Sequence, residues 1–232
     1  MNKYGIIGAM ELEVDTLKSR MEIVRKVEKA NMVFFEGKLN GAEVVIVKSG
    51  IGKVNAGICV QILCDEFKIT HVINTGVAGS LKAFIDIGDI VVSTDACYHD
   101  MDATIFGYAL GEVPQIGTRF FLADEALREQ AILSCKAVNP DIQVHSGRVV
   151  SGDQFISSHE AKDRISKNFD AYCTEMEGAA IAHAAYLNSL PFVILRAISD
   201  KADDSAEMDY PTFERKAADC CAKLVEDMVG AL

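Results

Sequence analysis

Short apolar runs recur along this chain with room for a helix between many of them, and this spacing constrains the fold more than any other feature. Several runs are apolar throughout and do not alternate with polar residues, which is typical of strands covered on both faces of a sheet. The runs that we expect to form strands are residues 4–7, 32–36, 44–47, 72–74, 90–93, 144–150 and 192–195. Helices packed over both faces of such a sheet indicate an α/β fold.

Local signals give the direction of one strand pair and the places of the helices. Asn40-Gly41 separates the second and third runs, and Asn-Gly is a strong signal for a two-residue hairpin, so those strands should be antiparallel. In residues 213–228, apolar positions recur at three- and four-residue spacing among charges, which predicts an amphipathic helix. Further helices are expected over residues 53–66, 124–138 and 178–185. We therefore predict a three-layer α/β/α fold with a mixed central sheet.

The chain has 232 residues, of which 50% are hydrophobic, and this is enough for one large domain with a substantial core. No internal repeat, low-complexity tract or linker divides it, so residues 1–232 are expected to form a single domain. The longest stretch without Asp, Glu, Lys or Arg, residues 178–195, contains His183, Asn188 and Pro191. A helix, a turn and a buried strand explain this stretch more simply than a membrane span does.

The formal net charge of -11 restricts the partners. Binding to a nucleic-acid backbone or an anionic membrane requires clustered Lys and Arg, which the chain lacks, so we expect a small neutral or cationic ligand instead. Only Lys3 precedes a short apolar run that ends at Glu11, which is too short for a secretory signal. We expect a cytoplasmic protein.

The cysteines, histidines and glycines do not indicate a disulfide framework, a metal site or a nucleotide cofactor. The 7 cysteines form no C-x-x-C pair, and the 5 histidines show no H-E-x-x-H spacing. Gly50-Ile51-Gly52 and residues 75–79 each follow an apolar run, where glycine lets backbone amides approach a ligand or simply allows a tight turn. Neither completes a dinucleotide fingerprint or a phosphate-binding P-loop. We predict no metal and no dinucleotide or ATP site.

Three carboxylates stand beside apolar elements, where a charge costs free energy unless it is used. Glu13 follows the first run, Asp200 closes the last one, and Glu177 opens the alanine-rich helix. Ligands of α/β sheets bind beyond the carboxyl ends of the strands, so we expect these acids to meet in one site, with Arg196 nearby. Taken singly, each acid could equally be a helix N-cap or a solvated turn residue.

Carboxylates of unequal pKa are what cleavage of a glycosidic bond requires. One protonated acid stabilises the leaving group, an ionised one activates water, and others hold the sugar hydroxyls. Three acids together with glycine loops therefore favour this chemistry over three unrelated structural roles.

A set of short motifs, in order along nearly the whole chain, makes this interpretation more specific. The motifs are GIIGAMELEV at residues 5–14, SGIGKVNA at 49–56, NTGVAG at 74–79, YHD at 98–100, FGY at 106–108, SGDQFI at 151–156, EME at 175–177 and RAISD at 196–200. With them the chain resembles the bacterial 5'-methylthioadenosine/S-adenosylhomocysteine nucleosidases. The resemblance implies one α/β domain with a mixed sheet, a homodimer, and hydrolysis of an adenine N-glycosidic bond without a cofactor.

The resemblance also implies roles for the polar residues. Asp200 would protonate or hydrogen-bond adenine N7, and Glu13 would take the proton from the attacking water. Glu177 would hold the ribose hydroxyls, with Met176 against the sugar and Arg196 near the nucleophile.

The remaining substrate-binding residues follow from the resemblance in the same way. Phe155 would stack on adenine, and the backbone of Ile156 would read the edge of the base. Ala78 and Gly79 would also bind the substrate. The pocket for the 5'-thio group would be lined by Met10, Ile51, Phe106, Tyr108 and Tyr210, part of it from residues 103–114 of the partner subunit. Taken singly, Met10, Ile51 and Phe106 are better explained as ordinary core residues, and their assignment to the pocket rests on the resemblance alone.

Two further considerations bear on the activity. A phosphorylase needs basic or hydroxyl groups for its phosphate, whereas the first loop here carries Glu11 and Glu13, so hydrolysis is favoured over phosphorolysis. Val77 stands where many family members have Ser or Thr, and Tyr210 where Phe is common. The alternatives are a hydrolase of another 5'-modified adenosine, such as an aminofutalosine, and a nucleoside-binding protein that does not catalyse.

Overall fold

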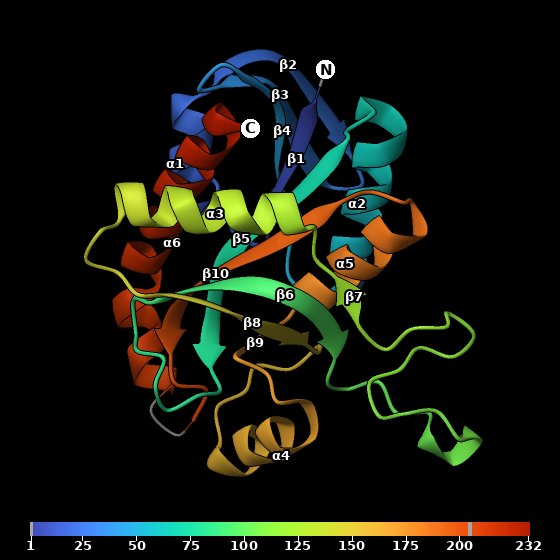
Figure 1. The fold of residues 1–232 in the computed structure, drawn as a ribbon. Helices are drawn as coiled ribbons and strands as arrows, with labels where there is room; N and C mark the ends of the chain where they lie inside the picture. The colour runs from blue at the N-terminus through green and yellow to red at the C-terminus, as the bar shows by residue number, and fades with distance from the viewer. Residues whose placement is uncertain (1, 204–205) are drawn as a thin grey trace.

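The computed structural model describes residues 2–203 and 206–232, which form alternating strands and helices (Figure 1). In chain order the elements are β1 (Lys3–Gly8), η1 (Glu11–Glu13), α1 (Asp15–Arg20), β2 (Glu22–Lys29), β3 (Met32–Leu39), β4 (Ala42–Lys48), α2 (Lys53–Phe67), β5 (His71–Ser80), β6 (Ile90–Tyr98), η2 (Thr104–Phe106), β7 (Phe121–Leu122), α3 (Glu125–Val138), β8 (Val144–Ser151), α4 (His159–Phe169), β9 (Cys173–Glu175), α5 (Gly178–Leu187), β10 (Phe192–Asp200) and α6 (Ala206–Ala231). Every apolar run expected to be a strand lies in one of these strands, and each expected helix overlaps one of these helices.

The strands form one mixed sheet, as expected. β1 is parallel to both of its neighbours, β4 and β5, and β5 is parallel to β10. β3 and β4 are antiparallel and joined through Asn40 and Gly41, whose φ angles of 48° and 86° suit a tight hairpin turn. The hairpin prediction is therefore confirmed.

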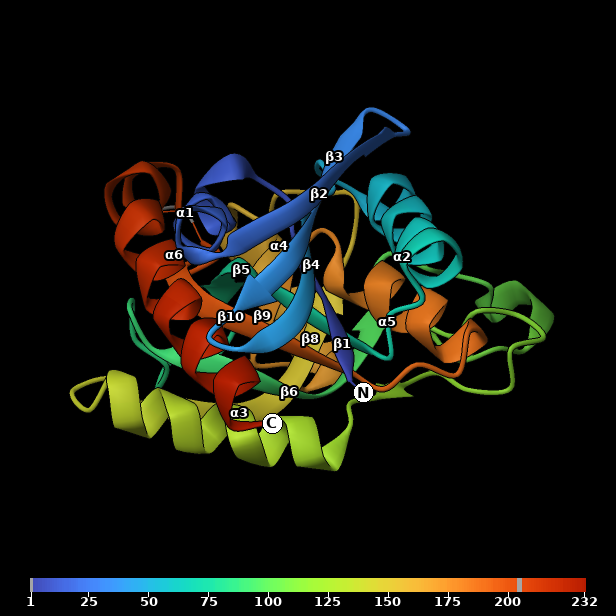
Figure 2. The same cartoon turned by 90° about the horizontal axis from the view of Figure 1, so that it is seen from above.

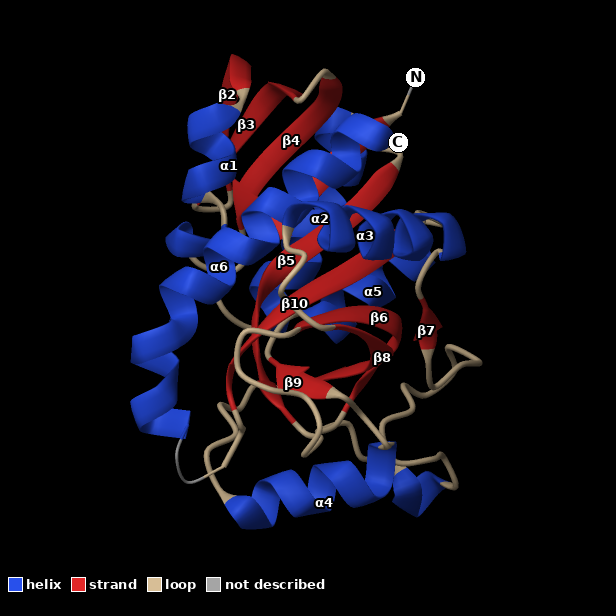
Figure 3. Cartoon of the chain, turned by 60° about the vertical axis from the view of Figure 1, so that its left-hand side comes forward, coloured by secondary structure: helices blue, strands red, loops and turns tan. Residues whose placement is uncertain are grey.

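One end of the sheet closes on itself, which the sequence did not predict. β5 pairs with β10, β10 with β6, β6 with β8, β8 with β9, and β9 returns to β5 (Figure 3). The return pairing is short, since it joins only Gly79 to Thr174 and Ser80 to Cys173. This closed ring of strands brings the ends of β5, β9 and β10 together.

Helices cover the sheet on both faces, which confirms the three-layer arrangement. α2 and α5 pack on one face, and α1, α3 and α6 pack on the other (Figure 2). The short helix α4 lies across the open end of the ring and buries Ile165 and Phe169 there. None of the helices in the described part of the chain is long and apolar enough to cross a membrane.

The elements that the sequence did not predict lack a buried apolar run. β2 is an edge strand with the sequence EIVRKVEK, and nearly all of its residues are exposed, so it carries no hydrophobic signal. β7 and β9 are only 2 and 3 residues long. α1 buries Leu17 alone among its 6 residues.

A glycine in β8 allows the ring to close tightly, and this generates a stability prediction. A Cβ atom at Gly147 would lie 2.2 Å from Cγ of Tyr172, the residue immediately before β9. We expect Gly147→Ala to lower the free energy of unfolding by about 1–3 kcal/mol in urea denaturation, because the ring of Tyr172 must move.

The control for this substitution is Leu133→Ala on α3, where the side chain is 61% exposed. It should change the free energy of unfolding by less than about 0.5 kcal/mol. Equal stability of Gly147→Ala and the unsubstituted protein would show that the contact between β8 and Tyr172 is not tight.

Candidate active site

A cavity of about 320 Å³ lies where the carboxyl ends of β1, β5, β9 and β10 meet. Its wall contains the three acids singled out from the sequence, together with apolar side chains such as those of Met10, Val77 and Met176. The lining residues are Ala9, Met10, Glu13, Ile51, Val77, Ala78, Gly79, Phe155, Thr174, Glu175, Met176, Glu177, Ser199, Asp200 and Tyr210. The sequence expectation that these acids share one site therefore agrees with the geometry.

Glu13 is held by three backbone amides. Its Oε2 accepts hydrogen bonds from the amides of Ala9 at 2.7 Å and Met10 at 2.9 Å, and its Oε1 accepts one from the amide of Val77 at 3.1 Å. Burial raises the pKa of Glu13, whereas the charge of Arg196 and the three amides oppose the rise. The carboxylate is thus fixed in place while its proton affinity is increased, as a general base requires.

Glu177 precedes the first turn of α5 and faces a second carboxylate. Its Oε1 accepts a hydrogen bond of 2.7 Å from the amide of Gly52. Burial, followed by the negative charge of Glu175, raises the pKa of Glu177 to about 8.

Asp200 ends β10 with both oxygens partly engaged. Its Oδ1 accepts a hydrogen bond of 2.8 Å from the amide of Ala202, and Ser199 Oγ donates to its Oδ2 at 2.8 Å. Burial is the main cause that raises the pKa of Asp200, against these two hydrogen bonds. A carboxyl group of raised pKa at the edge of a cavity is suited to hold a proton and donate it.

Arg196 does not line the cavity. Its side chain is 2% exposed and lies behind the wall, where Nη2 is 2.5 Å from Oε2 of Glu175 and also donates to Asn74 Oδ1. The guanidinium therefore acts on the acids of the cavity through its charge and through Glu175.

The other sequence-assigned residues divide into two groups. Met10, Ile51, Ala78, Gly79, Phe155, Met176 and Tyr210 line the cavity, and Ile156 lines a small pocket that shares several of its residues. Within the wall, the rings of Phe155 and Tyr210 meet edge to face at 5.8 Å, and Tyr210 Oη donates to Met10 Sδ at 3.3 Å. These contacts make one part of the wall apolar and aromatic.

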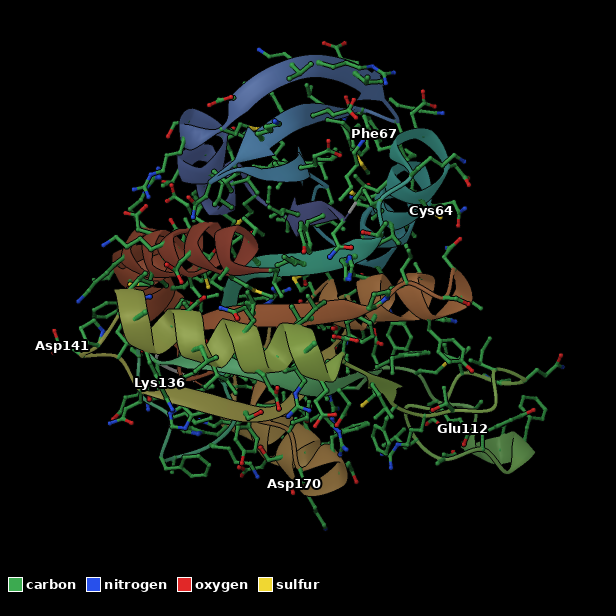
Figure 4. All side chains as sticks on the ribbon, turned by 45° about the horizontal axis from the view of Figure 1, so that its top comes forward. Cys64, Phe67, Glu112, Lys136, Asp141 and Asp170 are labelled. Atoms are coloured by element: carbon green, nitrogen blue, oxygen red, sulfur yellow. The ribbon has the colours of Figure 1, made fainter. Side chains whose placement is uncertain are left out.

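Phe106 and Tyr108 do not reach the cavity of their own chain. They belong to the segment between β6 and β7 that projects from the body of the molecule, and Phe106 is 79% exposed (Figure 1). Glu112, labelled in Figure 4, marks the same projecting segment.

Several polar residues of the site received no role from the sequence. Glu175 is buried beside Arg196, and Ser151, Asn74 and Ser199 hydrogen-bond to the charged groups. Glu175 belongs to the motif Glu175-Met176-Glu177, which the sequence analysis singled out. β9 has only 3 residues, however, which is too short for an alternating pattern to show that the Glu175 side chain is buried.

The described residues that line the cavity include four carboxylates and no Lys, Arg or His. Among the residues that the structure describes, no group of three or more His, Cys, Asp and Glu side chains is arranged to hold a metal ion. The site can therefore offer fixed negative charge, raised proton affinity and an apolar wall to a ligand.

Comparison with known proteins gives a consistent result. Residues 3–230 match the model of the phosphorylase superfamily. A 5'-methylthioadenosine/S-adenosylhomocysteine nucleosidase of Staphylococcus haemolyticus is 40% identical over 98% of this chain and 99% of its own length. The corresponding nucleosidase of Staphylococcus aureus strain MRSA252 is 42% identical over 98% and 99%.

Solved structures agree with the sequence relatives. The 5'-methylthioadenosine/S-adenosylhomocysteine nucleosidase of Neisseria meningitidis, in complex with methylthio-immucillin-A, superposes with a TM-score of 0.96 at 40% identity and covers 100% of both chains. The futalosine hydrolase of Helicobacter pylori superposes with a TM-score of 0.93 at 32% identity, over 100% of this chain and 98% of its own.

The match of nearly the whole chain to the superfamily, and its identity of 40% and more to curated relatives, confirm the resemblance carried by the motifs. The chain belongs to the bacterial 5'-methylthioadenosine/S-adenosylhomocysteine nucleosidases, which are N-glycosyl hydrolases within the phosphorylase superfamily.

Proposed function

We propose that this enzyme hydrolyses the N-glycosidic bond of 5'-methylthioadenosine and S-adenosylhomocysteine, releasing adenine and the 5-thioribose product. The observation that carries the proposal is the convergence of Glu13, Glu177 and Asp200 on one cavity with an apolar wall. The named activity of the relatives, at 40–42% identity over almost the whole chain, supports the same substrates. 5'-Deoxyadenosine, which has no thioether tail, is a further candidate substrate.

Departure of adenine requires a proton donor. We assign this role to Asp200, since burial raises its pKa and so favours its protonated form. Donation to adenine N7 lets the base leave as a neutral molecule. Phe155 at the cavity wall would stack on the base, and the backbone of Ile156 in the adjoining pocket would read its edge.

Attack on the sugar requires an activated water. We assign this role to Glu13, whose orientation the amides of Ala9, Met10 and Val77 fix. Glu177 would bind the ribose hydroxyls, with Met176 against the sugar. The negative charge of these carboxylates also stabilises the positive charge that develops on the sugar as the bond breaks.

Water is favoured over phosphate as the nucleophile. The described lining carries four acidic side chains and no cation, and those that are ionised would repel a phosphate dianion. Arg196 cannot offset this repulsion directly, because its guanidinium is paired with Glu175 behind the wall. Val77 contributes its backbone amide to Glu13, so the missing hydroxyl at this position leaves the base held in place.

We also propose a homodimer in which the projecting segment of each chain completes the cavity of the other. An exposed apolar face supports this, because Val54 and Ile58 of α2, Leu122 of β7 and Ile105 of the segment are 43–87% exposed. α2, α5, β7 and the segment lie on the same side of the molecule in Figures 1 and 2. Phe106 and Tyr108 would then line the partner's 5'-thio pocket.

The cellular role that we propose is disposal of both thioether nucleosides in methionine salvage, in the cytoplasm. All 7 cysteines are free thiols, which is typical of a reducing compartment. No metal or organic cofactor is required by the acid and base chemistry proposed for the site.

Adenine release from purified protein tests the activity. We expect rapid release from 5'-methylthioadenosine and S-adenosylhomocysteine, slower release from adenosine, and equal rates with and without inorganic phosphate, because the cavity repels the dianion. The assay is ultraviolet detection of free adenine.

Each other outcome supports an alternative. A requirement for phosphate would make the protein a phosphorylase, and preference for an aminofutalosine would agree with the similarity to the futalosine hydrolase. Absence of release from every nucleoside would favour a binding protein that does not catalyse.

Asp200→Asn tests the proton donor. We expect kcat for 5'-methylthioadenosine to fall by roughly 10²–10⁴-fold, since general acid catalysis is lost, while the nucleoside still binds in calorimetry because the amide preserves the shape of the carboxyl group. Asp89→Asn is the matched control, since Asp89 is also a buried acid but lies outside the cavity. A kcat of Asp200→Asn within threefold of the control, on the order of 1 kcal/mol or less, would disprove the assignment.

Val54→Glu tests the dimer. Val54 is 73% exposed on α2, and a charge there should prevent burial of the apolar face. We expect the mass measured by analytical ultracentrifugation to fall from that of two chains to that of one. KM for 5'-methylthioadenosine should rise about tenfold, because the partner's Phe106 is lost from the pocket. Val24→Glu, at an 80% exposed position of β2, should leave both quantities unchanged. A dimeric Val54→Glu protein of unchanged KM would contradict the proposed interface.

A further inference from the structure

A buried polar network crosses the ring of strands behind the cavity. It runs from Ser151 on β8 to Glu175 on β9, then to Arg196 on β10 and Asn74 on β5. Asn74 Nδ2 then donates to the backbone oxygen of Ile7 on β1 at 2.9 Å. Every strand whose end forms the cavity therefore has a polar link to this network.

Glu175 is the centre of this network. Its Oε1 accepts from Ser151 Oγ, and its Oε2 accepts from Arg196 Nη2 at 2.5 Å and from the amides of Glu177 and Gly178 at 3.1 and 2.7 Å. The side chain is only 4% exposed. A carboxylate buried to this extent is stable only when it is paired and hydrogen-bonded, and here every partner belongs to the site or to its support.

One side of the network fixes Glu177. The amides of Glu177 and Gly178 begin α5, and Glu175 binds both, while Ser151 Oγ accepts from the amide of Ala179 at 2.7 Å. These bonds satisfy amides that a helix leaves unpaired at its N-terminus. They hold the backbone of Glu177 so that its own carboxylate meets the amide of Gly52.

The other side of the network acts on Glu13. Arg196 has its guanidinium placed by Glu175 and Asn74, and from there its charge favours the ionised form of Glu13. If Glu175 lost its charge, Arg196 would keep its own and have the carboxylates of Glu13 and Glu177 as its remaining acidic neighbours.

We propose that Glu175 is a positioning residue for hydrolysis. Its single carboxylate fixes the position of Glu177 and also sets the charge environment of Glu13. This inference rests on the proposed function, since it concerns the same site and reaction. It differs from a purely structural role, in which Glu175 would only stabilise the ring, because it predicts a change in the pH dependence of activity.

The direction of that change follows from the charges around Glu177. Glu175 on β9 and Glu13 on η1 raise the pKa of Glu177, Arg196 on β10 and the Gly52 amide lower it, and burial is the largest cause of the rise. Removing the charge of Glu175 therefore lowers the pKa of Glu177, and the unpaired Arg196 lowers that of Glu13 as well. If both acids must be ionised, the acidic limb of kcat/KM moves to lower pH. A loss of stability alone scales the rate and leaves the limb in place.

The experiment compares three variants with the wild type by adenine release from 5'-methylthioadenosine across pH. Glu175→Gln should lower kcat about 100-fold and move the acidic limb down by roughly one pH unit. Glu175→Asp keeps the negative charge, but its shorter side chain moves the carboxylate away from its partners. We therefore expect kcat to fall while the acidic limb of kcat/KM stays at the same pH. Ser151→Ala should lower kcat about tenfold with the limb unmoved, since only one support of Glu175 is lost.

Asp95→Asn is the matched control, because Asp95 is a buried acid of β6 paired with Arg148 at 2.5 Å and does not line the cavity. It should leave kcat and the limb unchanged. If Glu175→Gln does not fold, Glu175→Asp and Ser151→Ala decide, and wild-type kcat in both overturns the proposal. An unmoved limb in folded Glu175→Gln also overturns it. Absence of adenine release from the wild type would instead refute the proposed function.

Discussion

The short antiparallel pairing of β9 with β5 is the contact on which the rest of the site depends. It joins only Gly79 to Thr174 and Ser80 to Cys173, yet it closes the ring of strands. Without this closure β9 would be joined to β10 and β5 within the sheet only indirectly, through β8 and β6. With it, the Glu177 carboxylate accepts a hydrogen bond from the amide of Gly52, although the two residues are 125 positions apart in the sequence.

Two glycines of β5 let the acids of the site approach its backbone closely. A Cβ atom at Gly79 would lie 2.7 Å from Asp200 Oδ1, and one at Gly76 would lie 2.5 Å from Glu13 Oε1. Both acids therefore pack directly against the backbone of β5. Side chains at these two positions would push the carboxylates away from the places where backbone amides and Ser199 hold them.

Much of the fold could be predicted from the sequence because its strands are apolar runs and its hairpin carries a specific turn signal. The ring could not, since β9 spans 3 residues and pairs through two of them, which is below the length at which a pattern can be recognised. The edge strand β2 is 8 residues long but was missed because nearly all of its residues are exposed and no buried apolar run marks it.

The same division applies to the candidate site. Glu13, Glu177 and Asp200 could be singled out because each interrupts or ends an apolar element, and the structure brings all three to one cavity. Glu175 could not be assigned a role, since its role depends on contacts with Ser151 and Arg196, which lie on other strands of the ring and which no local pattern reveals. Phe106 and Tyr108 could be assigned only by resemblance, because no contact within one chain brings them to the cavity.

The apolar wall of the cavity raises the pKa values of its acids. Burial is the largest cause of the raised pKa of Glu13, Glu177 and Asp200, so the proton affinities of the site depend on how much water the cavity excludes. A substrate with an apolar 5' tail against Met10 and Tyr210 displaces water from the same space and strengthens every electrostatic interaction within it. Recognition of the tail next to the sugar and readiness of Asp200 to hold its proton are therefore consequences of one property of the cavity, its low polarity.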